Sequence, residues 1–295
     1  WVRHRCGVIV SLFLLRWPFK APKIPLYRSR TDHPGRAMVP MVPDWFLKEF
    51  SMSDFQQPQN PFATQTGAVV DAGLKAHMQS VYNRMTMGLA ITSFVAYVAG
   101  HSLAILQIIT NPAVAMILAL SPLALIWFGF RPDRMPAKKL QATFIMLSVL
   151  YGLSFATIFL VYVPADIVRA LLMTTIMFAG LSIFGYTTKR DLAPVGVFCI
   201  MAMWGLLAFT LLAMLGMAFN VVPVSSGVNN VISIATILIF SGLTAFETQA
   251  TKELYNPGYG VEGNSRLAWM AALHLHISFI ALFQSLLQLM SNNRN

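Results

Sequence analysis

The chain has 295 residues, of which 56% are hydrophobic and only 11% are charged. A soluble domain usually carries about 25% charged residues to cover its surface, so this composition excludes a soluble globular protein. The charged residues are also clustered between long uncharged stretches, which indicates that lipid is the solvent for most of the chain. The two cysteines, Cys6 and Cys199, lie far apart and predict neither a disulfide framework nor a zinc site.

A net charge of +10 would fit a nucleic-acid partner, but the distribution of the charge argues against one. Residues 1–51 hold nine Lys or Arg against three Asp or Glu, so +6 of the total lies in this segment. The other basic residues lie largely in loops between apolar runs, as on the cytoplasmic side of membrane proteins. We therefore expect the lipid bilayer, and no nucleic acid, as a partner.

Residues 1–51 are expected to be a spurious or disordered leader. The apolar run at 6–15 is too short to span a bilayer. Arg3 and Arg5 precede this run as in a signal peptide, but no small-residue cleavage site follows it. An upstream mis-called start is the preferred interpretation. The candidate true starts are Met38, Met41 and Met52.

Residues 52–84 are expected to form a cytoplasmic N-terminal tail and a lead-in helix. From 53 to 67 the chain is rich in Gln, Pro, Asn and Thr, a composition typical of a disordered tail. The segment 69–80 then has the pattern of a short amphipathic helix.

Residues 85–290 contain seven apolar segments, which we predict to be transmembrane helices. Each is long enough to cross about 30 Å of hydrocarbon at about 1.5 Å per residue. Only helices satisfy their own backbone hydrogen bonds there, and no period-two pattern competes, so the predicted fold class is all-α. The predicted spans are 85–105, 113–130, 140–163, 167–186, 194–219, 228–249 and 267–290. Small residues that would let these helices approach closely are Gly180, Ser182, Gly185, Gly205, Ser241, Gly242 and Ala245.

Alternate loops differ sharply in positive charge. The loops after the second, fourth and sixth spans carry Lys and Arg, whereas 106–112 has no basic residue and 220–230 has no charged residue. The positive-inside rule therefore predicts a cytoplasmic N-terminus and a C-terminus on the outer side. The basic loop residues are Arg131, Arg134, Lys138, Lys139, Lys189, Arg190, Lys252 and Arg266.

Ionisable residues inside spans are costly in lipid and are therefore functional candidates. Glu247 is the one acidic residue well inside a predicted span, near the cytoplasmic boundary. The alternative is that its side chain reaches out to the interface and has no specific role. His274 and His276 lie two residues apart and point to opposite sides of a helix, so they cannot bind one metal ion together. Each is either a structural, hydrogen-bonded histidine or a proton-sensitive group.

The motifs of common enzymes are missing from the sequence. It contains no P-loop, no HExxH and no GxSxG, and the last span has no Lys for a retinal Schiff base. We therefore expect no enzymatic activity, no cofactor and no metal centre.

Two separated segments carry a family likeness. LTAFETQATKELY (243–255) resembles the sixth-helix signature of the Bax inhibitor-1 family, and AALHLHISFIALFQSLLQL (271–289) is similar to its seventh-helix pattern. The segments MSDFQQPQNPF, GLKAHMQSVYNRMTMGLA and FGYTTKRDL also resemble bacterial members.

The resemblance implies seven transmembrane helices, with the last helix central and wrapped by the other six. It also implies the bacterial inner membrane, a periplasmic C-terminus and a pH-dependent calcium leak. Some bacterial members interact with a membrane-bound AAA protease, which makes such a protease a candidate partner. In the family, an aspartate in each of the last two helices is latched to an arginine. Carried over, these positions are Glu247, Ser278 and, as the most plausible arginine, Arg131, with Arg134 as the alternative.

The chain departs from this pattern at three positions of the last helix. Ser278 replaces a carboxylate, His276 replaces the usual Tyr and Ala281 replaces the usual Asn. A pair of carboxylates titrates as a coupled unit, whereas a Glu–Ser pair does not. The resulting hypothesis is that an ion pair between Glu247 and Arg131, with Ser278 as a hydrogen-bond donor, holds the cytoplasmic side closed.

The sequence leaves two functions open. The first is a pH-sensitive calcium or cation leak channel, in which Glu247, Ser278, Arg131 and His276 take part in ion passage or pH sensing. The second is a membrane regulator or scaffold that modulates a membrane-bound protease or a stress response through its tail and the loop at 251–266. A solute transporter is a third class, which no repeat or broken-helix signature favours.

Overall fold

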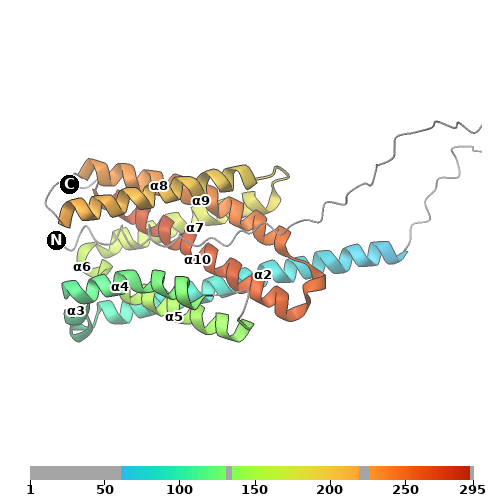
Figure 1. The fold of residues 1–295 in the computed structure, drawn as a ribbon, viewed down its shortest axis with the longest axis horizontal. Helices are drawn as coiled ribbons and strands as arrows, with labels where there is room; N and C mark the ends of the chain where they lie inside the picture. Colours follow the sequence, from blue (N-terminus) through green and yellow to red (C-terminus); the bar gives the residue numbers. More distant parts are fainter. Residues whose placement is uncertain (1–60, 131–134, 219–225, 293–295) are drawn as a thin grey trace, which may run out of the picture. The chain divides into compact units, whose positions relative to one another are not determined.

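The computed structural model describes residues 61–130, 135–218 and 226–292, and every regular element within them is helical. The leader at 1–51 and the start of the tail lie outside this part of the chain. In order, the elements are α2 (Pro61–Gly100), α3 (Leu103–Ile109), α4 (Pro112–Ala124), the π-helix η3 (Leu125–Gly129), α5 (Ala137–Phe155), α6 (Ile158–Val161), α7 (Pro164–Thr187), α8 (Ala193–Ala218), α9 (Ser226–Leu254), the 3-10 turn η4 (Pro257–Tyr259) and α10 (Gly260–Asn292) (Figure 1). The helices from residue 72 onward belong to one compact unit, which holds all the contacts between helices described below.

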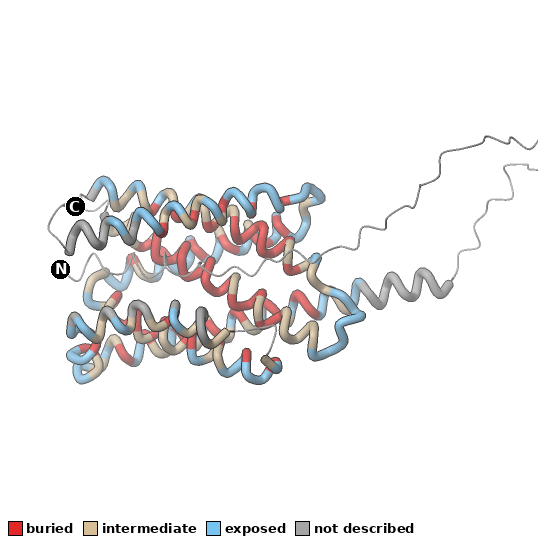
Figure 2. The backbone as a smooth tube through the Cα atoms, viewed as in Figure 1, coloured by how far each residue is buried: buried red, intermediate tan, exposed pale blue. Residues whose placement is uncertain are grey.

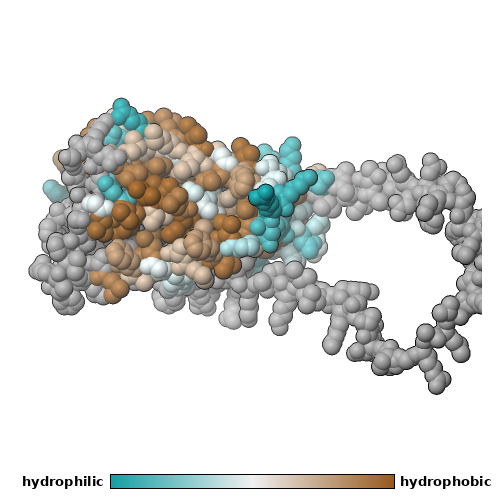
Figure 3. Space-filling view, turned by 90° about the horizontal axis from the view of Figure 1, so that it is seen from above, coloured by the Kyte–Doolittle hydropathy of each residue, from teal (hydrophilic) through white to brown (hydrophobic). Residues whose placement is uncertain are grey.

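The predicted all-α membrane fold is confirmed. Four described helical segments are long and apolar enough to cross a bilayer, and a bent pair of helices raises the number to five. Large apolar side chains are exposed on α7, α8 and α9, among them Ile176, Leu212 and Leu238. Hydrophobic atoms cover much of the described surface in Figure 3, while hydrophilic atoms gather toward one end. Apolar surface of this extent is typical of a membrane-embedded protein. The count of seven spans stays a prediction.

The first predicted span is not one straight helix. α2 ends at Gly100, and α3 leaves it at an angle of 100°. Ser102 between them has an extended backbone, and an added Cβ on Gly100 would lie 2.5 Å from the ring of Phe159. The chain thus turns where Phe159 approaches the backbone, at a glycine that leaves room for it.

α2 is also longer at its start than the sequence suggested. The lead-in helix expected at 69–80 is not a separate element, because α2 runs through it without a break. Residues 61–67, expected to belong to a disordered tail, form the first turns of α2. Good helix formers such as Ala, Leu, Lys, Gln and Met dominate between 74 and 90, and they favour one continuous helix.

Proline explains the irregular end of the second predicted span. Pro122 lies in the last turn of α4 and has no N–H to donate. The π-helix η3 begins at Leu125, directly after the end of α4. A wider helical turn accommodates such a lost hydrogen bond. At the other end of α4, Asn111 accepts a hydrogen bond from the Ala113 N–H at 3.1 Å and caps the helix.

The central position of the last helix is confirmed. α10 lies in the middle of the helices in Figure 1, and buried residues are concentrated along it in Figure 2. In its most apolar stretch, 78% of residues are buried, against 22% in α7. α10 packs mainly against α9, α7 and α5. A helix that is apolar on all sides is stable only when other helices surround it.

The small residues contribute unequally to helix packing. Gly185 of α7 lies directly against the backbone of Ala245 in α9, and Gly242 of α9 lies against the Cys199 side chain in α8. An added Cβ on Gly180 or Gly205 would have no neighbour within 4 Å, so the expected close approach is wrong at these two positions.

Candidate functional site

Glu247 and Ser278 meet inside the bundle. The Ser278 Oγ donates a hydrogen bond to the Glu247 Oε2 at 2.8 Å, although the residues are 31 positions apart. Antiparallel packing of α9 against α10 brings them together. The Glu247 residue is only 4% exposed, so the alternative that it reaches out to the interface is wrong. The hydrogen bond that the family resemblance led us to expect from Ser278 to Glu247 is therefore present in the helix interface.

The turn of α9 after Glu247 is tied to two other parts of the fold. The Gln249 Oε1 accepts a hydrogen bond from the Leu192 N–H at 2.8 Å, and its Nε2 donates to the Arg190 carbonyl at 2.8 Å. The Thr248 hydroxyl donates to the Ser182 hydroxyl of α7 at 3.4 Å. These contacts fix the rotation of α9, so Glu247 is held toward α10. Sequence analysis noted Gln249 only as part of a motif and missed this role.

The charged partner proposed for Glu247 is an arginine that precedes α5 in the chain. Arg131 and the alternative Arg134 both lie outside the described residues. Within the described ranges, the ion pairs join Arg169 to Asp166 and Arg266 to Glu262, and neither reaches Glu247. The second oxygen of the Glu247 carboxylate, Oε1, can bind a proton, pair with a basic side chain or coordinate a cation.

His276 lies on a different side of α10 from Ser278, as its position two residues earlier predicts. Its ring is fully buried and packs against Phe144 and Tyr151 of α5, with ring centroids 5.4 and 6.0 Å away. An added Cβ on Gly88 of α2 would lie 3.1 Å from its Nδ1. The structure therefore does not bring His276 together with the Glu247–Ser278 pair. No group of three metal-binding side chains occurs in the part of the chain that the structure describes.

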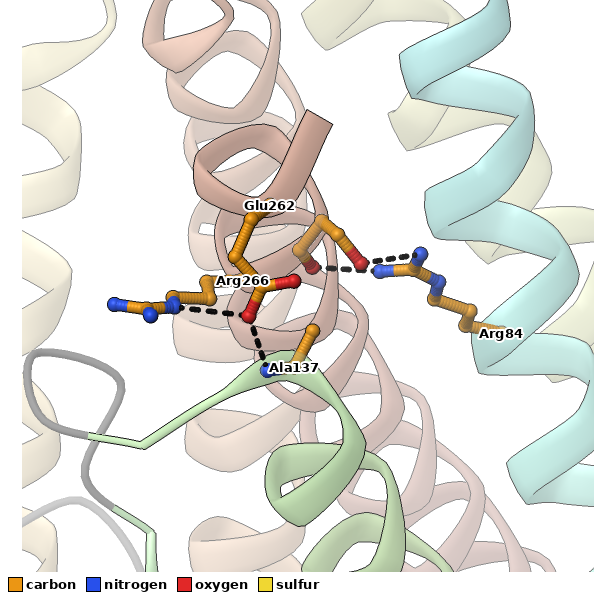
Figure 4. Close-up of polar contacts among 5 residues, drawn as sticks. Arg84, Ala137, Glu262 and Arg266 are labelled. Carbon is orange, nitrogen blue, oxygen red and sulfur yellow. Dashed lines mark hydrogen bonds and ion pairs between the residues drawn. The ribbon is translucent and has the colours of Figure 1, made fainter. Parts of the chain in front are cut away.

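A second cluster joins three helices near the start of α10, and we call it the clasp: Arg84, Ala137, Glu262, Ser265, Arg266 and Trp269. Figure 4 labels Arg84, Ala137, Glu262 and Arg266 of this cluster. The Arg84 guanidinium of α2 donates to the Ser265 carbonyl at 2.7 Å and to its hydroxyl at 3.1 Å. It also lies over the Trp269 ring, 4.4 Å from the centroid. On the other side, the Glu262 Oε1 accepts from the first N–H of α5, that of Ala137, at 2.8 Å. Sequence analysis missed the clasp because no local pattern links residues so far apart.

The comparisons agree with this architecture. The family described as inhibitor of apoptosis-promoting Bax1 matches residues 74–295. The chain is 33% identical over 230 residues to the inner membrane protein YbhL of Escherichia coli, covering 76% of this chain and 94% of YbhL. It is 32% identical over 236 residues to an uncharacterized protein of Caulobacter vibrioides, covering 76% and 92% of the two chains. An uncharacterized protein of Borreliella burgdorferi is 31% identical over 225 residues, with 74% and 92% covered.

The matched region contains α9, α10 and both members of the buried Glu247–Ser278 pair. The family match covers most of the chain, and the relatives are matched over nearly their whole length. This chain is therefore a member of the Bax inhibitor-1 family of integral membrane proteins.

Proposed function

We propose that this chain forms a pH-sensitive cation leak across the bacterial inner membrane, with calcium as the permeant ion and Glu247 as the titrating group. The observation that carries the proposal is a carboxylate buried between α9 and α10 with a hydroxyl bonded to it. The similarity to an inner membrane protein supports the location. The proposed activity involves no enzymatic step and no cofactor.

Glu247 has the chemistry that such a leak requires. An ionised carboxylate inside a bilayer needs a compensating partner, because hydrocarbon does not solvate charge. In the proposed closed state, Arg131 supplies that charge and Ser278 donates the hydrogen bond. A proton taken up by Glu247 removes the attraction to Arg131 and loosens the closed arrangement. Calcium flux should therefore rise as the pH falls.

The test is calcium flux into liposomes that contain the purified protein, measured across a range of pH. Glu247→Gln keeps the shape and hydrogen-bonding capacity of the side chain but cannot ionise. Its flux should be nearly independent of pH and close to the highest flux of the wild type. Asp166→Asn, at the start of α7, is the control and should keep the wild-type pH profile. Superimposable profiles for the wild type and Glu247→Gln would dispose of the proposal.

A second function, a regulator or scaffold for a membrane-bound protease or stress response, is favoured by the α9–α10 connection. Tyr259 in this connection is 56% exposed, and Val261 in the first turn of α10 is 91% exposed. They lie among charged and polar residues at the end of the bundle that is predicted to be cytoplasmic. Exposed apolar side chains in a polar loop are candidates for contact with another protein. A membrane-bound AAA protease is the partner that this second proposal names.

A further inference from the structure

The interface between α9 and α10 is polar at two separate levels. At one level, Ser278 donates to Glu247. At the other, the Ser233 hydroxyl of α9 lies 3.1 Å from the Gln288 Oε1 of α10 in a hydrogen bond. Ser233 and Glu247 are fourteen residues apart on α9, which is about 20 Å along a helix.

Apolar side chains separate the two levels. Phe240 lies midway between Ser233 and Glu247 on α9 and is 1% exposed. Ala281 and Leu282, which lie between Ser278 and Gln288 on α10, are also buried. In channels, a short apolar constriction between polar positions acts as a barrier that closes by excluding water.

Gln284 is an unusual residue to find in the core of a membrane protein. It lies one turn before Gln288 on α10, so the two side chains leave the helix on the same side. Gln284 is only 7% exposed, and neither its Oε1 nor its Nε2 has a hydrogen-bond partner among the described residues. An amide has two acceptor sites and two donors, and burying them unpaired in an apolar environment is costly. Such a group is retained where it serves a solute or water.

The level of Ser233 and Gln288 is on the outer side in the predicted orientation, and we call it the outer level. It offers neutral oxygen atoms and no charged side chain. Residues 226–240 of α9 and 280–292 of α10 contain no Asp, Glu, Lys or Arg. The oxygen-bearing side chains that are buried or half-buried there include Ser233, Gln284, Ser285 and Gln288. Amide carbonyls and hydroxyls of this kind are ligands for hard cations such as calcium.

We propose that Gln284, together with Gln288 and Ser233, forms an outer cation-binding position in series with Glu247. Phe240 is the apolar barrier between the two positions. The inference rests on the proposed cation leak. It adds a binding position for the ion on the outer side and names the side chains that bind it there. A cation that leaves the neutral outer position passes the barrier and reaches the level of Glu247, where protonation of the carboxylate has opened the path.

Gln284→Leu separates this role from a structural one. If the amide held helices together, its removal would destabilise the protein. Because it is buried without a partner among the described residues, replacing it with an apolar side chain of similar size should raise the melting temperature. The same change should lower calcium flux by at least about tenfold, the effect of losing one oxygen ligand to a charged species.

The experiment uses the full chain in liposomes and in detergent. Calcium flux and the calcium-dependent rise in melting temperature are measured for the wild type, Gln284→Leu, Gln284→Glu and the control Gln107→Leu. Gln107 is exposed on α3 and undergoes the same chemical change. Gln284→Glu should lower the half-saturating calcium concentration several-fold, because it adds charge with little change of shape. Gln107→Leu should match the wild type in both measurements.

The outcomes distinguish this inference from the proposed leak. If both Gln284 variants had the same calcium flux as the wild type, the proposed outer binding position would be wrong and the proposed leak would remain. Absence of flux in the wild type would contradict the leak. In that case, calcium binding at Gln284 would still be supported if calcium raised the melting temperature of every protein except Gln284→Leu. An equal rise in all four proteins would exclude calcium binding at this position. A lower melting temperature of calcium-free Gln284→Leu would assign Gln284 a structural role instead.

Discussion

Ser278 stands at the position where the family resemblance leads us to expect a second carboxylate. Its hydroxyl donates to Glu247 at 2.8 Å, so it lies where a second acid would share a proton with the first. A serine can donate to the ionised carboxylate and accept from the protonated one, but it adds no charge of its own. The pair therefore titrates as one group in this chain.

Ser278→Asp tests whether the pair has a single titrating group. Two carboxylates at hydrogen-bond distance titrate as a coupled unit, so the pH dependence of calcium flux should shift toward higher pH and extend over two steps. Liposome flux measured over the same pH range as for the wild type would show the change. Ser278→Ala is the matched control, because it removes the hydroxyl without adding an acid, and its profile should keep a single step. A Ser278→Asp profile that coincides with that of Ser278→Ala would show that the second acid does not couple to Glu247.

Sequence alone identified Glu247 but could not establish how deeply it is buried. Charge and position place it near the end of an apolar run, where a long side chain can turn toward either water or protein. The outcome depends on the rotation of α9, which Gln249 fixes through a loop almost sixty residues earlier. The surroundings of Gln284 could not be predicted for the same reason, since its neighbours are set by tertiary packing.

At the scale of elements, the clasp joins α2, α5 and α10 at one end of the bundle. Arg84 makes two hydrogen bonds to Ser265 and lies over Trp269, whose ring is in turn 5.5 Å from that of Phe144 in α5. Glu262 completes the cluster by capping α5 across a sequence separation of 125 residues. Three helices that are distant in sequence thus share one set of polar contacts.

Arg84→Ala should separate α2 from α10 at this end. The loss of charge-assisted hydrogen bonds and of the cation–π contact should lower the free energy of unfolding by about 2 kcal/mol. Arg84→Lys should recover only part of this, because an ammonium cannot reproduce the planar contacts of a guanidinium. Denaturant unfolding in detergent micelles would measure the difference.

Arg169→Ala is the control, because it removes an exposed arginine that is paired with Asp166 at 3.6 Å. It should lower the free energy of unfolding by less than about 1 kcal/mol. Equal effects of the two alanine variants would contradict the role assigned to the clasp.

The ends of the elements were predictable where charge or proline marks them. The span expected at 167–186 is observed as α7 at Pro164–Thr187, bounded by Pro164 and by the basic loop. The bend between α2 and α3 was not predicted, because 85–105 is apolar enough on average to resemble a single span, although Gly100, His101 and Ser102 lie where the chain turns against Phe159 of another helix. Hydropathy reports which residues avoid water, but it does not report where a neighbour forces the backbone to turn.

At the scale of the whole molecule, the exposed surface divides into two kinds. Apolar side chains on α7, α8 and α9 are suited to lipid, whereas Tyr259 and Val261 are exposed beside Glu262 and Asn256. Lipid explains the first group, whereas Val261 is 91% exposed among polar residues in the first turn of α10. The second group is the part of the surface that the proposed regulator function would use to contact a protein partner.

The double variant Tyr259→Ser with Val261→Ser should separate the two proposed functions. If the connection binds a membrane-bound AAA protease, co-reconstitution and pull-down with the purified protease should show at least about tenfold weaker binding, because two apolar contacts are lost. Calcium flux should stay at the wild-type level, since neither residue lies near Glu247. Val163→Ser changes an exposed valine in the connection before α7 and should affect neither measurement. Binding that survives in the double variant, or flux that disappears with it, would contradict this division of roles.

The burial of α10 has a consequence for biogenesis. It is the last of the described helices to leave the ribosome, yet the others need it to fill the space between them. Helices inserted earlier must therefore wait beside one another in the bilayer, with their inward-facing hydroxyl and amide groups incompletely satisfied, until translation has passed residue 292. We therefore expect this protein to assemble only after its helices have been inserted, and a quality-control protease in the membrane would then meet a nascent chain that still lacks its central helix.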